Sequence, residues 1–76
     1  MEKFTVGTRV RAIRSAQESN PENYLDYYLA GDTGIVIGSW MWMGLTGDDG
    51  VWVQFDEHRV TDGLWFVEYD SLEVAE

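Results

Sequence analysis

Short runs of alternating polar and apolar residues, each ended by glycine or by a polar segment, constrain the fold of this chain most strongly. In the first run, Val10 and Ala12 share one face while Arg9 and Arg11 share the other. The segment VWVQF at residues 51–55 alternates in the same way. A period of two is the pattern of a half-buried β-strand, and no periodic segment is long enough for an α-helix. The sequence therefore predicts an all-β fold.

The length of the chain limits how it can be stabilised. Seventy-six residues predict a single domain, residues 1–76, and a chain of this size buries only ~60% of its extended-chain surface. Cysteine is absent and His58 is the one histidine, so disulfides, thiolate metal sites and multi-histidine sites are excluded. Four Trp, four Tyr and three Phe remain to supply dense packing. We expect no cofactor.

The turn residues divide the chain into expected strands. Five are expected, at residues 8–14, 35–42, 51–55, 64–67 and 73–75, with a 3₁₀ turn over 68–72. Gly38 lies inside the second strand and predicts a bulge or bend. Gly31 and Gly34 predict a tight turn with positive φ before that strand. Three glycines within residues 43–50 predict a flexible hairpin loop.

Residues 15–31 are expected to form a long first loop. The first part is polar and holds the only proline, Pro21, and Ser19 or Asn20 could cap a single helical turn there. A loop this long in a small domain is usually functional or folded back over the core. We expect Leu25 and Leu29 to fold back over the core.

The order of these segments resembles the small five-stranded SH3-like barrel, and the run GDTGIVI at residues 31–37 resembles the core of KOW-type barrels. A similar pattern occurs in small phage and prophage proteins of unassigned function. The residues that carry this resemblance are Phe4, Val6, Gly7, Arg9, Val10, Arg11, Ala12, Gly31, Gly34, Val36, Val53, Phe55, Asp56, Glu57, Trp65, Phe66, Val67, Leu72 and Glu73. The layout is also similar to that of the photosystem I subunit that helps to dock ferredoxin. The resemblance implies an SH3-like barrel with a long first loop and a 3₁₀ turn before the last strand.

The net charge of −9 is unevenly distributed. Residues 1–14 carry four basic side chains and one acidic side chain, whereas residues 15–76 carry thirteen acids against Arg59 alone. Nucleic-acid binders usually have the opposite sign, so direct nucleic-acid binding is not expected. The acidic charge predicts either simple solubility, a partner with a basic surface, or mimicry of a polyanion.

Neither a membrane span nor a signal peptide is expected, because no apolar run has the length that either requires. The absence of cysteine fits a cytoplasmic protein. Catalysis is not expected either. His58 is interpreted as a solvated turn residue, and Asp48 and Asp49 as members of an ordinary hairpin turn.

The segment Trp40-Met41-Trp42-Met43 is the first candidate binding surface. In a strand, Trp40 and Trp42 would share one face, and Met41 and Met43 the other. A small barrel cannot bury both faces, and aromatic and Met side chains are enriched at interface centres. The alternative is that the tryptophans are core and the methionines cover a loop. The sequence leaves open which pair faces solvent.

The first loop is the second candidate, because Tyr24, Tyr27 and Tyr28 lie there with the acidic Glu22 and Asp26. Aromatic and acidic first loops grip Pro-rich, Arg-containing peptides in eukaryotic SH3 domains. The alternative is that these tyrosines cover the barrel. The full set of candidate partner-binding residues is Tyr24, Tyr27, Tyr28, Trp40, Met41, Trp42, Met43 and Trp52.

The combined expectation is a non-enzymatic, protein-binding accessory module of phage or prophage type. The alternatives are a polyanion mimic that blocks a nucleic-acid-binding protein of the host, and a KOW-like factor linked to nucleic acid. A homodimer is compatible with an exposed Trp and Met surface. Arg9, Arg11 and Arg14 are expected to form internal ion pairs with the acidic remainder.

Overall fold

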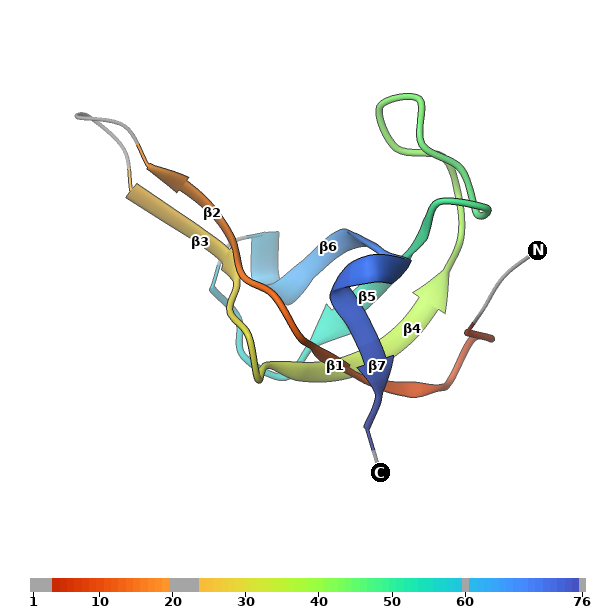
Figure 1. Ribbon diagram of the computed structural model, residues 1–76, viewed down its shortest axis with the longest axis horizontal. Coiled ribbons are helices and arrows are strands. Elements are labelled where there is room, and N and C mark those ends of the chain that lie inside the picture. The colour runs from red at the N-terminus through yellow and green to blue at the C-terminus, as the bar shows by residue number, and fades with distance from the viewer. Residues whose placement is uncertain (1–3, 20–23, 60, 76) are drawn as a thin grey trace.

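The computed structural model describes residues 4–19, 24–59 and 61–75, and the side chains of residues 19, 24 and 61 fall outside that description. The elements in order are β1 (Arg9–Ala12), β2 (Ala16–Ser19), β3 (Tyr24–Tyr28), β4 (Thr33–Gly38), β5 (Gly50–Phe55), η1 (Thr61–Gly63), β6 (Leu64–Glu68), η2 (Tyr69–Ser71) and β7 (Leu72–Val74) (Figure 1). All of these elements are strands except the two 3₁₀ turns that flank β6, so the predicted all-β fold is confirmed. The predicted 3₁₀ turn before the last strand is η2.

The strands form two antiparallel sheets. One has five strands in the order β6-β5-β4-β1-β7, and the other is the β2–β3 hairpin. Strands β6 and β7 are the two edges of the larger sheet, so this sheet is open in its pairing and is not a closed barrel. In Figure 1 the hairpin and the β4–β5 connection project from the sheet on either side of β6 and η2.

Strand β5 supplies the centre of the core, as its alternation predicts. Val51 and Val53 are fully buried, and Phe55 is 1% exposed. Val10 and Ala12 of β1 are buried in the same cluster, as predicted, whereas Arg9 is exposed. Burying one such apolar side chain contributes about 1.5–3 kcal/mol. The core therefore depends on a few valines and aromatic rings.

The expected long first loop is instead a hairpin. Tyr28 pairs with Ala16, and the register shifts between Ala16 and Gln17. Because the hairpin pairs its own backbone groups, the segment does not have to lie over the core to satisfy them. Leu25 is 37% exposed, so the expectation that it folds back over the core is wrong, whereas Leu29 is half-buried. The proposed helical cap at Asn20 and Pro21 lies outside the described residues.

The second expected strand ends earlier than predicted. Strand β4 stops at Gly38, and its register with β5 shifts between Val36 and Gly38, which confirms the predicted bulge. Trp40 follows the strand and turns back over Gly38, where an added Cβ would lie 2.3 Å from the Trp40 ring. The chain therefore leaves the sheet before the two tryptophans can share a strand face.

Gly34 has a different role from the predicted one. Gly31 has φ +97°, as a tight turn requires, but Gly34 lies inside β4 and pairs with both Val10 and Phe55. A Cβ at Gly34 would lie 2.5 Å from the Gln54 carbonyl oxygen. This glycine is therefore required by the close approach of β4 and β5.

Replacing Gly34 with alanine should destabilise the protein by about 1–3 kcal/mol, because the added methyl group meets backbone atoms that cannot move independently. Chemical denaturation measures the loss. The control is Ile35→Ala at the next position, where the side chain is 39% exposed and a smaller loss is expected. An unchanged stability for Gly34→Ala would contradict the close packing of these strands.

Candidate binding groove

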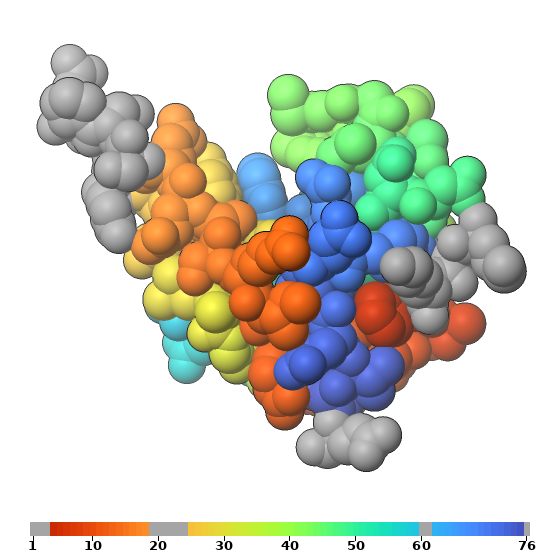
Figure 2. All heavy atoms as spheres, in the orientation of Figure 1, coloured from red at the N-terminus to blue at the C-terminus, as the bar shows by residue number. Residues whose placement is uncertain are grey.

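A groove lies between the β2–β3 hairpin and the connection from β4 to β5. Figure 2 shows the hollow between these two projecting segments, with residues of the C-terminal third at its base. Its volume is about 210 Å³. The lining residues are Ala16, Tyr28, Trp42, Leu45, Trp65, Phe66, Glu68 and Ser71. Six of these eight residues are aromatic or aliphatic, and Glu68, Ser71 and the Tyr28 hydroxyl add polar groups.

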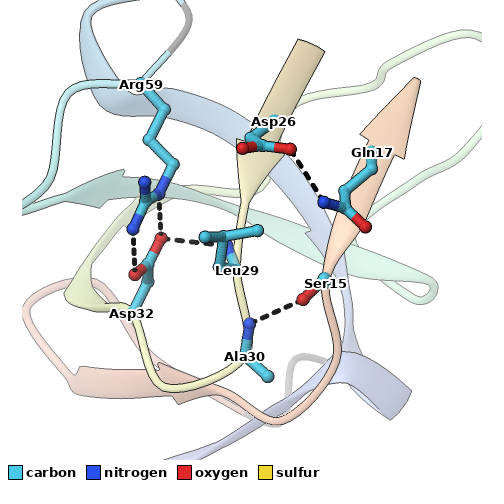
Figure 3. A network of polar contacts seen from close by, with 7 residues as sticks. All are labelled: Ser15, Gln17, Asp26, Leu29, Ala30, Asp32 and Arg59. Carbon is cyan, nitrogen blue, oxygen red and sulfur yellow. Dashed lines mark hydrogen bonds and ion pairs between the residues drawn. The ribbon is translucent and has the colours of Figure 1, made fainter. Parts of the chain in front are cut away.

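The hairpin wall is tethered at its base by polar contacts (Figure 3). The Asp32 carboxylate accepts a hydrogen bond from the Leu29 backbone N–H at 2.9 Å and pairs with the Arg59 guanidinium at 2.8 and 3.0 Å. The Ser15 hydroxyl accepts a hydrogen bond from the Ala30 backbone N–H at 2.9 Å. These contacts fix the direction in which the hairpin leaves the sheet.

Two tyrosines join the hairpin to the rest of the molecule. Tyr28 is buried and stacks on Phe55 in the core, with ring centroids 5.3 Å apart. Tyr27 stacks on Trp65 of β6, with centroids 4.3 Å apart. The Tyr27 hydroxyl donates a hydrogen bond to Glu18 at 2.7 Å, and this bond to a carboxylate raises the pKa of Tyr27. The tyrosines therefore hold the hairpin against the sheet.

The opposite wall contains a tight turn. Trp42 and Leu45 form an isolated antiparallel bridge, and the two residues between them, Met43 and Gly44, have φ of 47° and 85°. Positive φ at both central positions is typical of a type I′ turn, which joins antiparallel segments. Farther along, the Tyr69 hydroxyl of η2 donates a hydrogen bond to the Gly47 carbonyl. The predicted flexible loop is thus tied to the sheet.

The four tryptophans form one connected aromatic cluster. Trp40 stacks on Trp52 with centroids 4.9 Å apart, and the Trp52 indole N–H donates a hydrogen bond to the Trp40 carbonyl at 2.9 Å. Trp42 packs edge-on against both Trp52, at 5.3 Å, and Trp65, at 5.5 Å. Edge-on and stacked contacts of this kind stabilise beyond the area that they bury. The cluster places Trp42 and Trp65 at the groove.

The polar end of the groove is set by Tyr28 and its neighbours. Burial raises the pKa of the Tyr28 hydroxyl, and the charge of Glu68 raises it further. A hydrogen bond with Ser71 and the positive charge of Arg14 act in the opposite direction. The neutral hydroxyl, the Ser71 hydroxyl and the Glu68 carboxylate thus form one polar edge beside the aromatic rings.

The structure brings together only part of the predicted site. Tyr28 and Trp42 line the groove, and Tyr27 and Trp52 pack on the lining residues Trp65 and Trp42. The remaining candidates lie elsewhere: Trp40 is 50% exposed, Met41 66% and Met43 84%, outside the groove lining, and the Tyr24 side chain is outside the described residues. Both methionines face solvent, whereas Trp42 is half-buried and Trp40 stacks on Trp52 while half of its surface stays exposed.

Sequence reasoning missed Trp65, Phe66 and Glu68 as site residues. The run LWFV at residues 64–67 is apolar on both faces of a strand, and this is the signal that could have found them. A strand with two apolar faces needs a second covering layer. Here Tyr27 and Trp42 provide part of it by packing on Trp65.

Arg9 and Arg11 form the predicted ion pairs, whereas the ion pairs among the described residues do not include Arg14. Arg9 pairs with Asp56 at 2.9 Å and Arg11 with Glu73 at 2.9 Å. Both pairs are exposed and contribute little to stability. A hydrogen bond from Arg9 lowers the pKa of Asp56.

The residues considered for chemistry lie in turns. His58 is exposed in the connection after β5, and Asp49 accepts a hydrogen bond from the Thr46 backbone N–H at 2.8 Å within its own turn. Among the described residues, no three His, Cys, Asp or Glu side chains gather closely enough to hold a metal ion.

Within residues 4–19, 24–59 and 61–75, no helix has the length and apolar character needed to cross a bilayer.

Comparison of the chain with protein-family models, with curated proteins and with solved structures finds no match.

Asp32→Asn should lower the melting temperature by roughly 5–15 °C, because it weakens the contacts to Arg59 and to the Leu29 N–H. A hydrogen bond from Arg59 lowers the pKa of Asp32 in the folded state. The stabilisation is therefore complete above the unfolded pKa, about 3.9, and is lost as pH falls through the lower folded pKa.

Thermal melts of both proteins between pH 2 and 7 measure this effect. The gap between wild type and Asp32→Asn should be widest above pH 4 and should narrow below it. Glu73→Gln breaks an exposed ion pair and is the control, with a change of a few degrees at most. A gap that does not depend on pH would mean that the Asp32 charge does not hold the hairpin.

Proposed function

We propose that this chain is a protein-binding module whose groove holds an extended segment of a partner with a basic surface. The observation that carries this proposal is an open groove with aromatic lining, held between two tethered walls. Aromatic side chains are enriched at the centres of protein interfaces and carry much of the binding energy there. A groove of about 210 Å³ is smaller than the roughly 300–1,000 Å³ of sites for drug-sized molecules. It suits one or two side chains of a bound peptide.

The proposed fold class is SH3-like, with the barrel left open between the edge strands β6 and β7. The order β6-β5-β4-β1-β7, the hairpin placed between β1 and β4, and the η2 turn before β7 support this proposal. In this reading the β2–β3 hairpin is the long first loop expected from the resemblance. The proposal extends to an accessory protein of phage or prophage type, supported by the sequence pattern that includes Phe55, Asp56 and Glu57.

Binding fits the groove better than catalysis does. Its eight lining residues include one carboxylate, Glu68, and two hydroxyls, on Tyr28 and Ser71. Burial raises the pKa of the Tyr28 hydroxyl, which keeps it protonated and makes it a poor nucleophile. A nucleophile paired with a general base is the arrangement that hydrolytic chemistry needs. The lining offers recognition groups instead.

The charge of the chain favours a basic partner. The net charge is −9, and three of the five basic side chains, on Arg9, Arg11 and Arg59, are paired within the molecule. A field of one sign accelerates association with an oppositely charged partner and weakens as salt is added. The proposed complex should therefore form more slowly at high ionic strength.

A substitution that fills the groove should weaken peptide binding without unfolding the protein. The wild-type protein is first used to select binders from a library of displayed random peptides, which should enrich sequences that combine basic and apolar residues. Ala16→Phe places a ring in the groove and should weaken the selected peptides at least about tenfold, the scale of losing one hot-spot contact. Ala30→Phe is the matched control, because Ala30 is exposed and lies outside the groove lining.

Trp42→Ala provides a second variant. It should weaken peptide binding strongly while lowering the melting temperature only slightly. Melting curves and two-dimensional NMR spectra check that each variant is folded. If no peptide is enriched, or if Ala16→Phe and Ala30→Phe bind equally, the groove is not the binding site and the proposal is wrong.

Labelled DNA and RNA titrated at low salt test the alternatives. We expect no binding at a net charge of −9. Affinity that falls steeply with salt would indicate a nucleic-acid factor instead, and competition by excess DNA for a captured partner would indicate polyanion mimicry. Sedimentation at increasing protein concentration tests self-association through the exposed Met41 and Met43.

A further inference from the structure

We infer that the groove seats a single arginine or lysine side chain of the partner, with its apolar stem against Trp42 and Trp65 and its charged head at Glu68. This inference rests on the proposed function and adds the chemistry of the ligand.

The aromatic part of the groove forms a corner. The Trp42 and Trp65 rings are inclined at 65° to each other with centroids 5.5 Å apart, and both line the groove. Arginine and lysine place their methylene groups along apolar surfaces while their charged ends reach polar groups. A cation within about 6 Å of a Trp ring centroid is also attracted by the ring. Two inclined indoles can therefore contact one long side chain together.

Glu68 provides the charge at the polar end. It ends β6, is exposed and lines the groove beside Ser71. Among the described residues, the ion pairs use the carboxylates of Asp32, Asp56 and Glu73, and none of these pairs includes Glu68. The Tyr28 and Ser71 hydroxyls lie at the same end and can accept hydrogen bonds from a guanidinium or an ammonium group. An apolar side chain would leave these polar groups without a role in binding.

Arg14 belongs to the chain itself and supplies a positive charge near this end of the groove. Its charge and that of Glu68 both reach the Tyr28 hydroxyl, with opposite effects on the pKa of Tyr28. Arg14 is exposed and precedes the hairpin, and because its charge acts on the same hydroxyl as that of Glu68, we expect it to oppose an incoming cation. Removing its charge should therefore strengthen cation binding, whereas removing the charge of Glu68 should weaken it.

The test uses four synthetic peptides, Ac-Gly-Leu-X-Leu-Gly-NH₂, in which X is arginine, lysine, citrulline or norleucine. Citrulline keeps the shape of arginine without its charge. Binding is followed by NMR through the indole N–H signals of Trp42 and Trp65, with the Trp40 signal as the internal reference because Trp40 is outside the groove lining. We expect the arginine peptide to bind about five- to twentyfold more tightly than the citrulline peptide.

Charge variants distinguish the effect of the Glu68 carboxylate on binding from the effect of the overall negative charge. Glu68→Gln should weaken the arginine peptide about two- to fivefold and leave the citrulline peptide unchanged. Glu57→Gln is the matched control, because it makes the same change in net charge at an exposed position outside the groove lining. Arg14→Gln should strengthen the arginine peptide by about twofold. All three substitutions are at exposed positions, so the folded state should be retained.

The outcomes separate this inference from the proposed function. If all four peptides shift the Trp42 and Trp65 signals equally, the groove binds peptides without a cation seat, so this inference is wrong and the proposed function stands. If none of them shifts these signals and the library selection also fails, both are wrong. Equal losses for Glu68→Gln and Glu57→Gln would overturn the role of Glu68. Spermidine binding as tightly as the arginine peptide would overturn the assignment to a protein side chain.

Discussion

Aromatic stacking onto β5 and β6 holds both segments that project from the sheet. Tyr28 stacks on Phe55 and Tyr27 on Trp65 at the hairpin, while Trp40 stacks on Trp52 at the opposite wall. A chain of 76 residues without cysteine has no covalent cross-link to hold such projections. Flat rings bury a large area for few rotatable bonds, so they can fix a hairpin that makes few other contacts. The groove exists because both of its walls are held in this way.

Ion pairs and hydrogen bonds add to the stabilisation that this aromatic packing gives. Asp32 joins the turn before β4 to Arg59, and Tyr69 joins η2 to the opposite wall. Each contact links segments that are distant in the sequence, so the width of the groove depends on tertiary structure at both walls. In the proposed complex, the acidic field would act at longer range, while the groove residues, with Glu68 among them, would act only at contact. A basic partner would thus be attracted first by charge and then selected by the shape of the groove.

The sequence predicted strands best where the alternation was clear. The inward faces of β1 and β5, with Val10 and Val53 among them, follow directly from the period of two, and the bulge follows from the glycine at position 38. It failed at the first loop, because the pairing of Ala16 with Tyr28 leaves no periodic signal in a short polar hairpin. It also extended the second strand through Trp42, because residue type alone does not show where a strand leaves the sheet.

The sequence by itself determined the all-β class, the inward faces of the strands and the acidic charge, because each depends on local periodicity or on composition. Only the tertiary structure decided which aromatic residues share a surface. Trp42 and Trp65 are distant in the chain and meet through the turn at Met43 and the packing of Tyr27. Glu68 becomes a site residue only because β6 ends beside them. The physical reason is that the groove is made from the ends of separate segments, and sequence patterns describe each segment alone.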